Sequence, residues 1–279
     1  MKEHHILGLS GGKDSAALAV YMRQRYPHLD ITYFFTDTGK ELEEVYEFLG
    51  KLEGFLGKPI KRLNPDRDFD FWLREYNHFL PSPSTRWCTR QLKIAPLKRW
   101  VRPWLTAGDR VTSYVAIRAD EDQREGLLSQ HANMIVEMPF RHDGIDRNGV
   151  LEILNRSGIG LPRYYEWRSR SGCTFCFFQQ KVEWARLKRV HPIAFEAAKK
   201  YEKTALEHGS PFTWTQNESL EELEQPERIA EIEADFLLRR QREVARRRPN
   251  ALRDPEPMLG VDDLYLDDEG AGACLVCHK

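Results

Sequence analysis

Short apolar runs alternate with amphipathic stretches along the first half of the chain. Apolar runs at 5–9 and 31–35 predict buried strands, and each precedes a stretch with helical spacing, at 14–25 and 41–55. Strands that alternate with helices are typical of an α/β fold, with a mostly parallel sheet and flanking helices. The same criteria predict further strands at 59–63, 110–117 and 133–137, and a helix at 91–105 that is interrupted near Pro96.

The pattern changes after residue 144: a helix is followed by a loop that leads to Cys173, and helical spacing continues from Val182 onward. Residues 146–156 have the pattern of a capped helix, and 226–248 that of one long helix with acidic residues early and basic residues late. The last segment contains prolines and an acidic run. We therefore predict three regions: an α/β domain over 1–144, a cysteine-containing and helical region over 145–248, and an acidic tail with a terminal Cys-x-x-Cys over 249–279.

The composition indicates a folded protein. Of its 279 residues, 41% are hydrophobic and 11% aromatic, too many for a disordered chain. No apolar run has the roughly 18 residues of a membrane helix, and the first residues lack the apolar stretch of a signal peptide, so we expect a cytoplasmic protein without a membrane partner. The net charge is -1, so any affinity for nucleic acid requires a local basic patch.

Two local features are candidates for such a basic patch. Six arginines crowd the end of the long predicted helix, where they either contact nucleic acid or form a solvated face that complements the helix dipole. Trp167, beside Arg168 and Arg170, either stacks on bases or packs in the protein. The six arginines are Arg239, Arg240, Arg242, Arg246, Arg247 and Arg248.

The clearest chemical signal is the run Ser-Gly-Gly-Lys-Asp-Ser between the first strand and the first helix. Backbone N–H groups and the helix dipole favour an anion at a helix N-terminus, so this loop can hold phosphate. Its spacing differs from the G-x-x-x-x-G-K-S/T of a Walker loop, and the structural alternative is a glycine turn with a helix cap. The candidate nucleotide-binding residues are Ser10, Gly11, Gly12, Lys13, Asp14 and Ser15.

Two charged side chains follow predicted strands and join Lys13 and Ser15 as candidate catalytic groups. Ligands of open parallel sheets bind at the carboxyl ends of the strands. Asp37 could therefore hold Mg²⁺ or a ribose there, or cap the following helix. Arg118 could bind a phosphate or stabilise leaving pyrophosphate, or form an ion pair with neighbouring carboxylates.

The cysteines favour metal or redox chemistry over structural disulfides. They are odd in number and include two Cys-x-x-Cys pairs in a chain without a secretory signal. Their thiolates suit a soft metal, and Cys88 could also be a buried, inert residue. A four-cysteine Zn²⁺ site from the two pairs is a further possibility. The five cysteines are Cys88, Cys173, Cys176, Cys274 and Cys277.

Several segments, in order over residues 4–180, resemble the PAPS-reductase-like branch of the adenine nucleotide α-hydrolase superfamily. They are the loop 10–15, Phe-Thr-Asp-Thr-Gly at 35–39, the Cys88 segment 87–97, Ala-Ile-Arg-Ala-Asp-Glu at 116–121 and the Cys-x-x-Cys segment at 160–176. The resemblance implies the PP-loop nucleotide hydrolase fold, ATP and Mg²⁺ as ligands, and a [4Fe-4S] cluster on Cys88, Cys173 and Cys176. Its fourth position would be filled by Cys274 or Cys277, or left open for sulfur.

The family includes reductases of PAPS or APS and ATP pyrophosphatases that activate a nucleic acid for sulfur insertion. The reductases carry a C-terminal Glu-Cys-Gly-Leu-His motif, whereas this chain ends in Ala-Cys-Leu-Val-Cys-His-Lys. The pattern is therefore most similar to the DndC-like and SspD-like ATP pyrophosphatases of DNA phosphorothioation. That resemblance implies DNA, a sulfur donor such as a cysteine desulfurase and other phosphorothioation proteins as partners. The alternatives are a sulfonucleotide reductase and a non-catalytic, nucleotide- or metal-dependent interaction module.

Overall fold

A parallel sheet organises the chain, because its central strand is apolar on both faces. The computed structural model describes residues 1–279 except 65, 122–123, 125–130, 211 and 247–279. Successive residues of a strand point to opposite faces. Ile6 accordingly packs with Leu97 and Val101 on one face of the sheet, while Leu7 packs with Leu18 on the other. Burial of both faces requires helices on both sides of the sheet.

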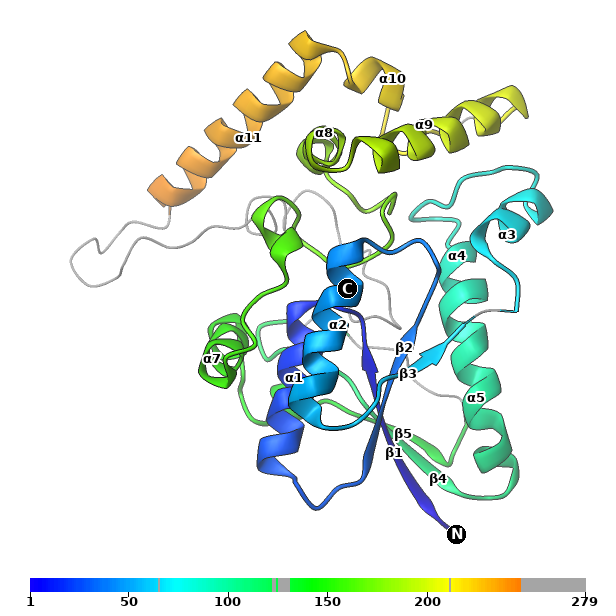
Figure 1. Cartoon of the computed structure of the whole chain (residues 1–279), viewed down its shortest axis with the longest axis vertical. Helices are drawn as coiled ribbons and strands as arrows, with labels where there is room; N and C mark the ends of the chain where they lie inside the picture. Colours follow the sequence, from blue (N-terminus) through cyan, green and yellow to red (C-terminus); the bar gives the residue numbers. More distant parts are fainter. Residues whose placement is uncertain (65, 122–123, 125–130, 211, 247–279) are drawn as a thin grey trace.

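Five strands form the sheet in the order β3-β2-β1-β4-β5, and every neighbouring pair is parallel (Figure 1). This arrangement confirms the expected α/β fold with a mostly parallel sheet. The strands are β1 (Glu3–Leu9), β2 (Ile31–Thr36), β3 (Lys61–Leu63), β4 (Arg110–Tyr114) and β5 (Met134–Glu137).

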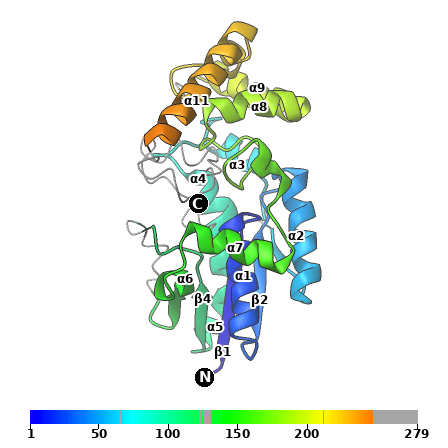
Figure 2. The ribbon, with the colours of Figure 1, turned by 90° about the vertical axis from the view of Figure 1, so that its left-hand side faces the viewer.

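Helices cover the sheet and extend beyond it. Around the sheet lie α1 (Lys13–Arg25), α2 (Glu43–Leu56), α3 (Phe69–Glu75), α4 (Trp87–Thr89), α5 (Ala95–Thr106), α6 (Pro139–His142) and α7 (Arg147–Ser157). The helices α8 (Lys181–Val190), α9 (Pro192–Glu207), α10 (Leu220–Leu223) and α11 (Pro226–Arg246) follow. They lie beyond the carboxyl ends of the strands in both views (Figures 1 and 2). The helical C-terminal region is thus confirmed as far as residue 246, and the predicted tail lies outside the described residues.

Local geometry differs from the sequence prediction at three places. The strand predicted over 110–117 ends at Tyr114; Val115 still donates its N–H to the Glu137 carbonyl, and Ala116 and Ile117 are buried beyond the strand. A π-helical turn, Arg90–Ile94, precedes Pro96, and the Ala95 N–H bonds the Arg90 carbonyl. Proline has no N–H to donate, so the irregularity falls before it. The helix α3 was not predicted, although Asp68 caps its first turn by accepting from the Phe71 N–H.

The predicted boundary at residue 144 stays a prediction. The helix α7, which follows that boundary, packs against α1 beside the sheet. Among the helices that the structure describes, none combines the length and apolar character needed to cross a lipid bilayer.

A buried carboxylate organises the C-terminal helices. Glu202 of α9 is almost completely buried, and its two oxygens accept the backbone N–H groups of Trp214, at 2.8 Å, and Leu220, at 2.5 Å. Burial raises the pKa of Glu202, and the two backbone hydrogen bonds oppose that change. The side chain therefore fixes the loop between α9 and α10.

We expect Glu202→Gln to lower the free energy of unfolding by about 1–3 kcal/mol, because an amide N–H would face one of those backbone N–H groups. Thermal and urea unfolding measure the change. The matched control is Glu207→Gln, an exposed position of the same helix, with an expected effect below about 0.5 kcal/mol. Equal unfolding midpoints for the two variants would contradict this role of Glu202.

Candidate functional site

The predicted nucleotide loop lies between β1 and α1, and Gly12 is the N-cap of α1. Gly11 has φ of +73°, a conformation that favours glycine, and a Cβ there would lie 2.5 Å from a methyl group of Val45. A Cβ on Gly12 would lie 2.8 Å from the Ser171 hydroxyl. Both glycines are needed for close approach, so the loop is a built structure at the start of a helix.

Hydrogen bonds inside the loop fix its two serines. The Ser10 and Ser15 hydroxyls lie 3.1 Å apart, and the Gly12 N–H donates to the Ser10 hydroxyl at 3.2 Å. Ser15 donates in turn to the Gly12 carbonyl. All three residues are buried, so the loop is preorganised for a ligand at the N-terminus of α1.

A distant segment packs on this loop. Tyr164, in a short 3-10 turn over Arg163–Glu166, donates its hydroxyl to the Gly11 carbonyl at 2.7 Å. The Lys13 N–H donates to the Tyr165 hydroxyl at 3.2 Å, and Ser171 donates to Ser10 at 3.3 Å. The Lys13 ammonium lies 5.0 Å from the centre of the Tyr165 ring. Residues 163–171 thus complete the nucleotide loop from the other part of the chain.

Arg118 lies at the carboxyl end of β4 and is surrounded by carboxylates. Its guanidinium donates to Asp14 at 3.0 Å and to both oxygens of Asp120, and it lies 3.9 Å from Glu121. Burial alone would lower the pKa of Arg118, but these three carboxylates raise it above its usual value. The ion-pair alternative therefore describes this arrangement, and a phosphate contact of Arg118, which would compete with three carboxylates, stays a prediction.

Asp37 follows β2 and does not cap the next helix, whose N-cap is Leu42. One oxygen accepts from the Gly39 N–H at 2.9 Å and from the Tyr46 hydroxyl at 2.8 Å. The other lies 3.6 Å from Arg62. The helix-cap alternative is wrong, and Mg²⁺ or ribose binding by this carboxylate stays a prediction.

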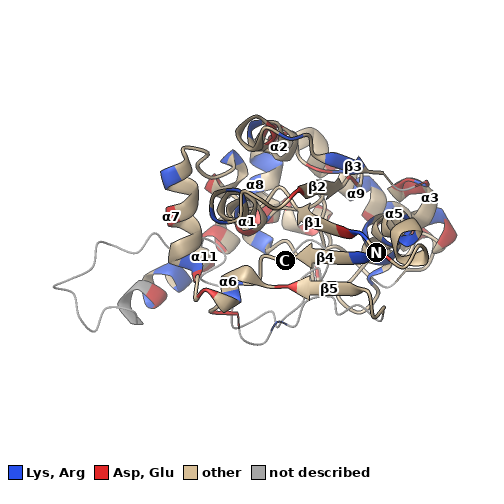
Figure 3. Cartoon of the chain, turned by 90° about the horizontal axis from the view of Figure 1, so that it is seen from below, with Lys and Arg blue, Asp and Glu red and all other residues tan. Residues whose placement is uncertain are grey.

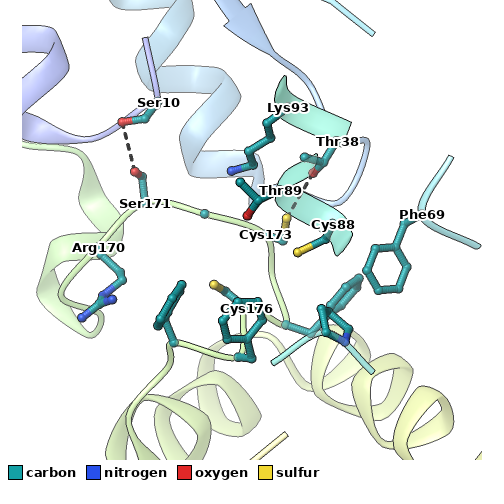
Figure 4. A pocket seen from close by; sticks show the side chains of 15 residues that line it. Ser10, Thr38, Phe69, Cys88, Thr89, Lys93, Arg170, Ser171, Cys173 and Cys176 are labelled. Atoms are coloured by element: carbon teal, nitrogen blue, oxygen red, sulfur yellow. Dashed lines mark hydrogen bonds between the residues drawn. The ribbon is translucent and has the colours of Figure 1, made fainter. Parts of the chain in front are cut away.

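Three of the predicted cysteines line one pocket together with Ser10 of the nucleotide loop. Figure 4 shows Cys88, Cys173 and Cys176 around it, with Ser10 and Ser171 on one side. The full lining is Ser10, Thr38, Phe69, Pro81, Cys88, Thr89, Lys93, Arg170, Ser171, Gly172, Cys173, Phe175, Cys176, Phe177 and Phe178. The tertiary structure therefore brings residues that are far apart in sequence to one place.

Cys173 is held by the loop after β2. Its thiol lies 3.2 Å from the Thr38 hydroxyl and 3.7 Å from a carboxylate oxygen of Glu41. Burial raises the pKa of Cys173, Glu41 raises it further, and Lys93 opposes the shift. These surroundings favour the thiol over the thiolate, so a ligand that needs the thiolate must supply positive charge of its own.

A buried arginine shapes the Cys-x-x-Cys loop. Arg168 is completely buried and donates to the carbonyls of Gly172, at 3.3 Å, and Cys173, at 2.9 Å. On its other side the loop is tied to Lys40, whose carbonyl accepts from the Thr174 N–H at 2.7 Å. These contacts fix the backbone from which Cys173 and Cys176 extend.

The three cysteine thiols are the type of ligand that binds an iron–sulfur cluster. No three His, Cys, Asp or Glu side chains within the described ranges are grouped closely enough to hold a single metal ion. Cysteines that bind a [4Fe-4S] cluster contact different irons, so they need to surround a common space and not a common point. Cys88, Cys173 and Cys176 surround such a space, whereas Cys274 and Cys277 lie outside the described residues.

Sequence reasoning missed several residues of the site. Lys93, Thr38 and Glu41 were not singled out, and Tyr164 carries no local signal for its contact with Gly11. Thr38 and Lys93 lie inside two segments that carry the family resemblance, 35–39 and 87–97, and that is the signal that could have pointed to them.

The structure describes part of the two candidate nucleic-acid-binding features, Trp167 and the arginines at the end of α11. Trp167 is buried against His191, which favours the packing alternative. Arg239 pairs with Asp235 one turn earlier on α11, as on an ordinary solvated helix face. Arg247 and Arg248 lie outside the described residues.

Comparison with known proteins finds a similarity in the first half of the chain. Residues 4–132 match the family model described as phosphoadenosine phosphosulfate reductase domain. Two curated relatives are the uncharacterized proteins MJ0066 and MJ0973 of Methanocaldococcus jannaschii, 28% identical over 201 residues and 24% identical over 191 residues. These matches cover 70% and 67% of this chain but 41% and 44% of the relatives. The chain thus spans less than half the length of the curated relatives it matches.

Two solved structures match the chain at low sequence identity. A phosphoadenylyl-sulfate (PAPS) reductase from Candida auris, in a phosphate complex, has a TM-score of 0.49 at 10% identity, over 61% of this chain and 81% of that one. The U34-tRNA thiolase NcsA from Methanococcus maripaludis, with its [4Fe-4S] cluster, has a TM-score of 0.40 at 16% identity, over 74% and 73%. Residues 4–132, which hold the nucleotide loop, Asp37, Cys88 and Arg118, are thus similar to a phosphoadenosine phosphosulfate reductase domain.

Proposed function

We propose that the protein is an ATP pyrophosphatase, which cleaves ATP to AMP and pyrophosphate and so activates DNA for sulfur insertion. The observation that carries the proposal is the pocket that Ser10 of the nucleotide loop shares with Cys88, Cys173 and Cys176. A loop suited to phosphate beside three thiols would place activation and sulfur delivery at one site. The sulfur donor, such as a cysteine desulfurase, and other phosphorothioation proteins belong to the same proposal.

The chemistry uses groups at two sides of the pocket. Backbone N–H groups at the start of α1 and the Lys13 ammonium would bind the ATP phosphates, and Asp37 offers oxygens to Mg²⁺. An oxygen of the acceptor phosphate attacks the α-phosphorus of ATP, the bond to the bridging oxygen of the β-phosphate breaks, and pyrophosphate leaves with that electron pair. A sulfur nucleophile then attacks the adenylated acceptor phosphorus, and AMP leaves. An iron–sulfur cluster held by Cys88, Cys173 and Cys176 would supply an iron that binds sulfur.

A sulfonucleotide reductase is the second candidate, because the matching family model is that of the phosphoadenosine phosphosulfate reductase domain. A reductase needs a mobile thiol that attacks the sulfonucleotide and a donor that resolves the product. Cys277, followed by His278, is the residue of this chain that could serve, although the surrounding Glu-Cys-Gly-Leu-His frame is absent.

We expect Lys13→Ala and Ser15→Ala each to reduce pyrophosphate release from Mg-ATP by about 10²–10³-fold, since Lys13 supplies positive charge for the phosphates and Ser15 holds the loop through its bond to the Gly12 carbonyl. A coupled pyrophosphate assay measures the rate. Lys51→Ala, at an exposed position of α2, is the matched control and should retain the wild-type rate. Unchanged release from both loop variants would exclude the proposed nucleotide site.

Metal and sulfide analysis tests whether the cysteines bind an iron–sulfur cluster. Protein purified without oxygen should contain about four irons and four sulfides per chain, and Cys88→Ser, Cys173→Ser or Cys176→Ser should each reduce both. The paired variant Cys274→Ser, Cys277→Ser tests the tail thiols in the same analysis. Stoichiometric Zn²⁺ without sulfide would contradict the cluster and support the four-cysteine zinc site.

Truncation after Gly270 separates the two enzymatic candidates, because it removes both tail cysteines and leaves the nucleotide loop intact. We expect pyrophosphate release from ATP to survive this truncation. Sulfite formation from PAPS or APS with thioredoxin, present in the full chain and lost in the truncated one, would replace the phosphorothioation proposal with the reductase.

A further inference from the structure

The pocket has a cationic and aromatic lining. Lys93 and Arg170 both line it, and no Asp or Glu occurs among its described lining residues. Four phenylalanines form its apolar walls: Phe69, Phe175, Phe177 and Phe178. Cations beside aromatic walls suit a ligand that combines negative charge with a planar ring.

Two arginines from different segments meet on one of these rings. The guanidinium carbon of Arg86 lies 5.2 Å from the centre of the Phe178 ring, and that of Arg170 lies 5.6 Å from it. Arg86 precedes the helix that carries Cys88, whereas Arg170 precedes the Cys173 loop. The ring therefore gathers two like charges at the pocket that holds the thiols.

Arg170 differs from the other arginines of the site. Arg118 is surrounded by three carboxylates, and Arg168 bonds two backbone carbonyls. Within the described part of the chain, the half-buried Arg170 guanidinium contacts the Phe178 ring and forms no ion pair with a carboxylate. In Figure 4 this guanidinium extends away from Ser10 and Ser171. It is thus positioned for an anion other than the phosphates at the nucleotide loop.

The charge arrangement favours a local anion site over a broad basic face. The net charge is -1, and Figure 3 shows Lys and Arg interspersed with Asp and Glu over the helices. A planar base can reach the phenylalanine walls only when it is unstacked, as in a single strand. The chain therefore offers phosphate contacts and a stacking surface at the same pocket.

We propose that Arg86, Arg170 and Phe178 form the entry subsite for a single strand of nucleic acid. The two guanidiniums hold a strand phosphate, and an unstacked base lies against the phenylalanine walls beside the cysteines. This inference rests on the proposed function, since it assigns the acceptor of that reaction to the side of the pocket away from the nucleotide loop.

Fluorescence anisotropy with a short labelled single-stranded DNA tests the subsite in the full-length protein. Arg170→Gln and Arg86→Gln should each weaken binding about tenfold, because each removes a charge-assisted phosphate contact. Each should also reduce the slope of log K against log salt by about 0.7. Arg170→Lys, which keeps the charge, should lie between wild type and Arg170→Gln. The control is Arg156→Gln, an exposed arginine of α7 that pairs with Glu152 and should bind like wild type.

The readouts separate this inference from the proposed function. Pyrophosphate release without DNA, in which water attacks the α-phosphorus in place of the acceptor oxygen, tests the nucleotide loop alone: its absence in the wild-type protein would overturn the proposed function whatever the strand-binding result. Tighter binding of single-stranded RNA, equally sensitive to Arg170→Gln, would support the entry subsite and overturn DNA as the acceptor. Strand binding that is insensitive to both glutamine variants, or weakened equally by Arg156→Gln, would overturn the subsite. An increased KM for PAPS in Arg170→Gln, with strand binding unchanged, would assign the arginine to a small nucleotide and also overturn it.

Discussion

The hydrogen bond from the Tyr164 hydroxyl to the Gly11 carbonyl joins the two parts of the candidate site, and the geometry of the pocket depends on it. A loop that turns its N–H groups toward an anion leaves carbonyls on its other side, and a buried carbonyl needs a donor. Tyr164 supplies that donor at 2.7 Å. Burial raises the pKa of Tyr164, which keeps its hydroxyl protonated and able to donate. The segment so anchored continues directly to Ser171 and Cys173.

The parallel sheet explains why the charged residues meet. The carboxyl ends of parallel strands lie at one edge of the sheet, so Ser10, Asp37 and Arg118 come together from three strands. Carboxylates surround Arg118 and leave that side of the site electrostatically paired. The pocket on the other side of the loop holds thiols and cations instead. One edge of one sheet therefore provides two chemically different surfaces beside the same loop.

The C-terminal helices hold the cysteine loop in place. The Lys40 ammonium, from the loop after β2, donates to Asp70 at 3.1 Å and to Tyr201 of α9 at 3.0 Å. Phe69 packs on Phe175 with ring centres 4.9 Å apart, and Phe175 also contacts Tyr201. These contacts connect the sheet, the cysteine loop and α9. Loss of this helix packing would therefore be expected to disturb the pocket before it disturbs the sheet.

The sequence by itself determined the elements and the kinds of chemistry. Apolar runs and helical spacing depend only on nearby residues, so strands such as β1 and helices such as α1 and α11 could be placed from the sequence. Local runs likewise identified the nucleotide loop and the cysteines. The strand predicted to residue 117 was too long, because burial of Ala116 and Ile117 comes from packing and not from pairing.

Only the tertiary structure decided which of these residues act together. Contacts such as Tyr164 with Gly11, or Arg86 and Arg170 with Phe178, join positions that no local pattern relates. Their partners are selected by the chain path and by the need to satisfy buried polar groups, which arise when the whole fold closes. The same closure brings Cys88 to Cys173, and so sets which thiols can share a ligand.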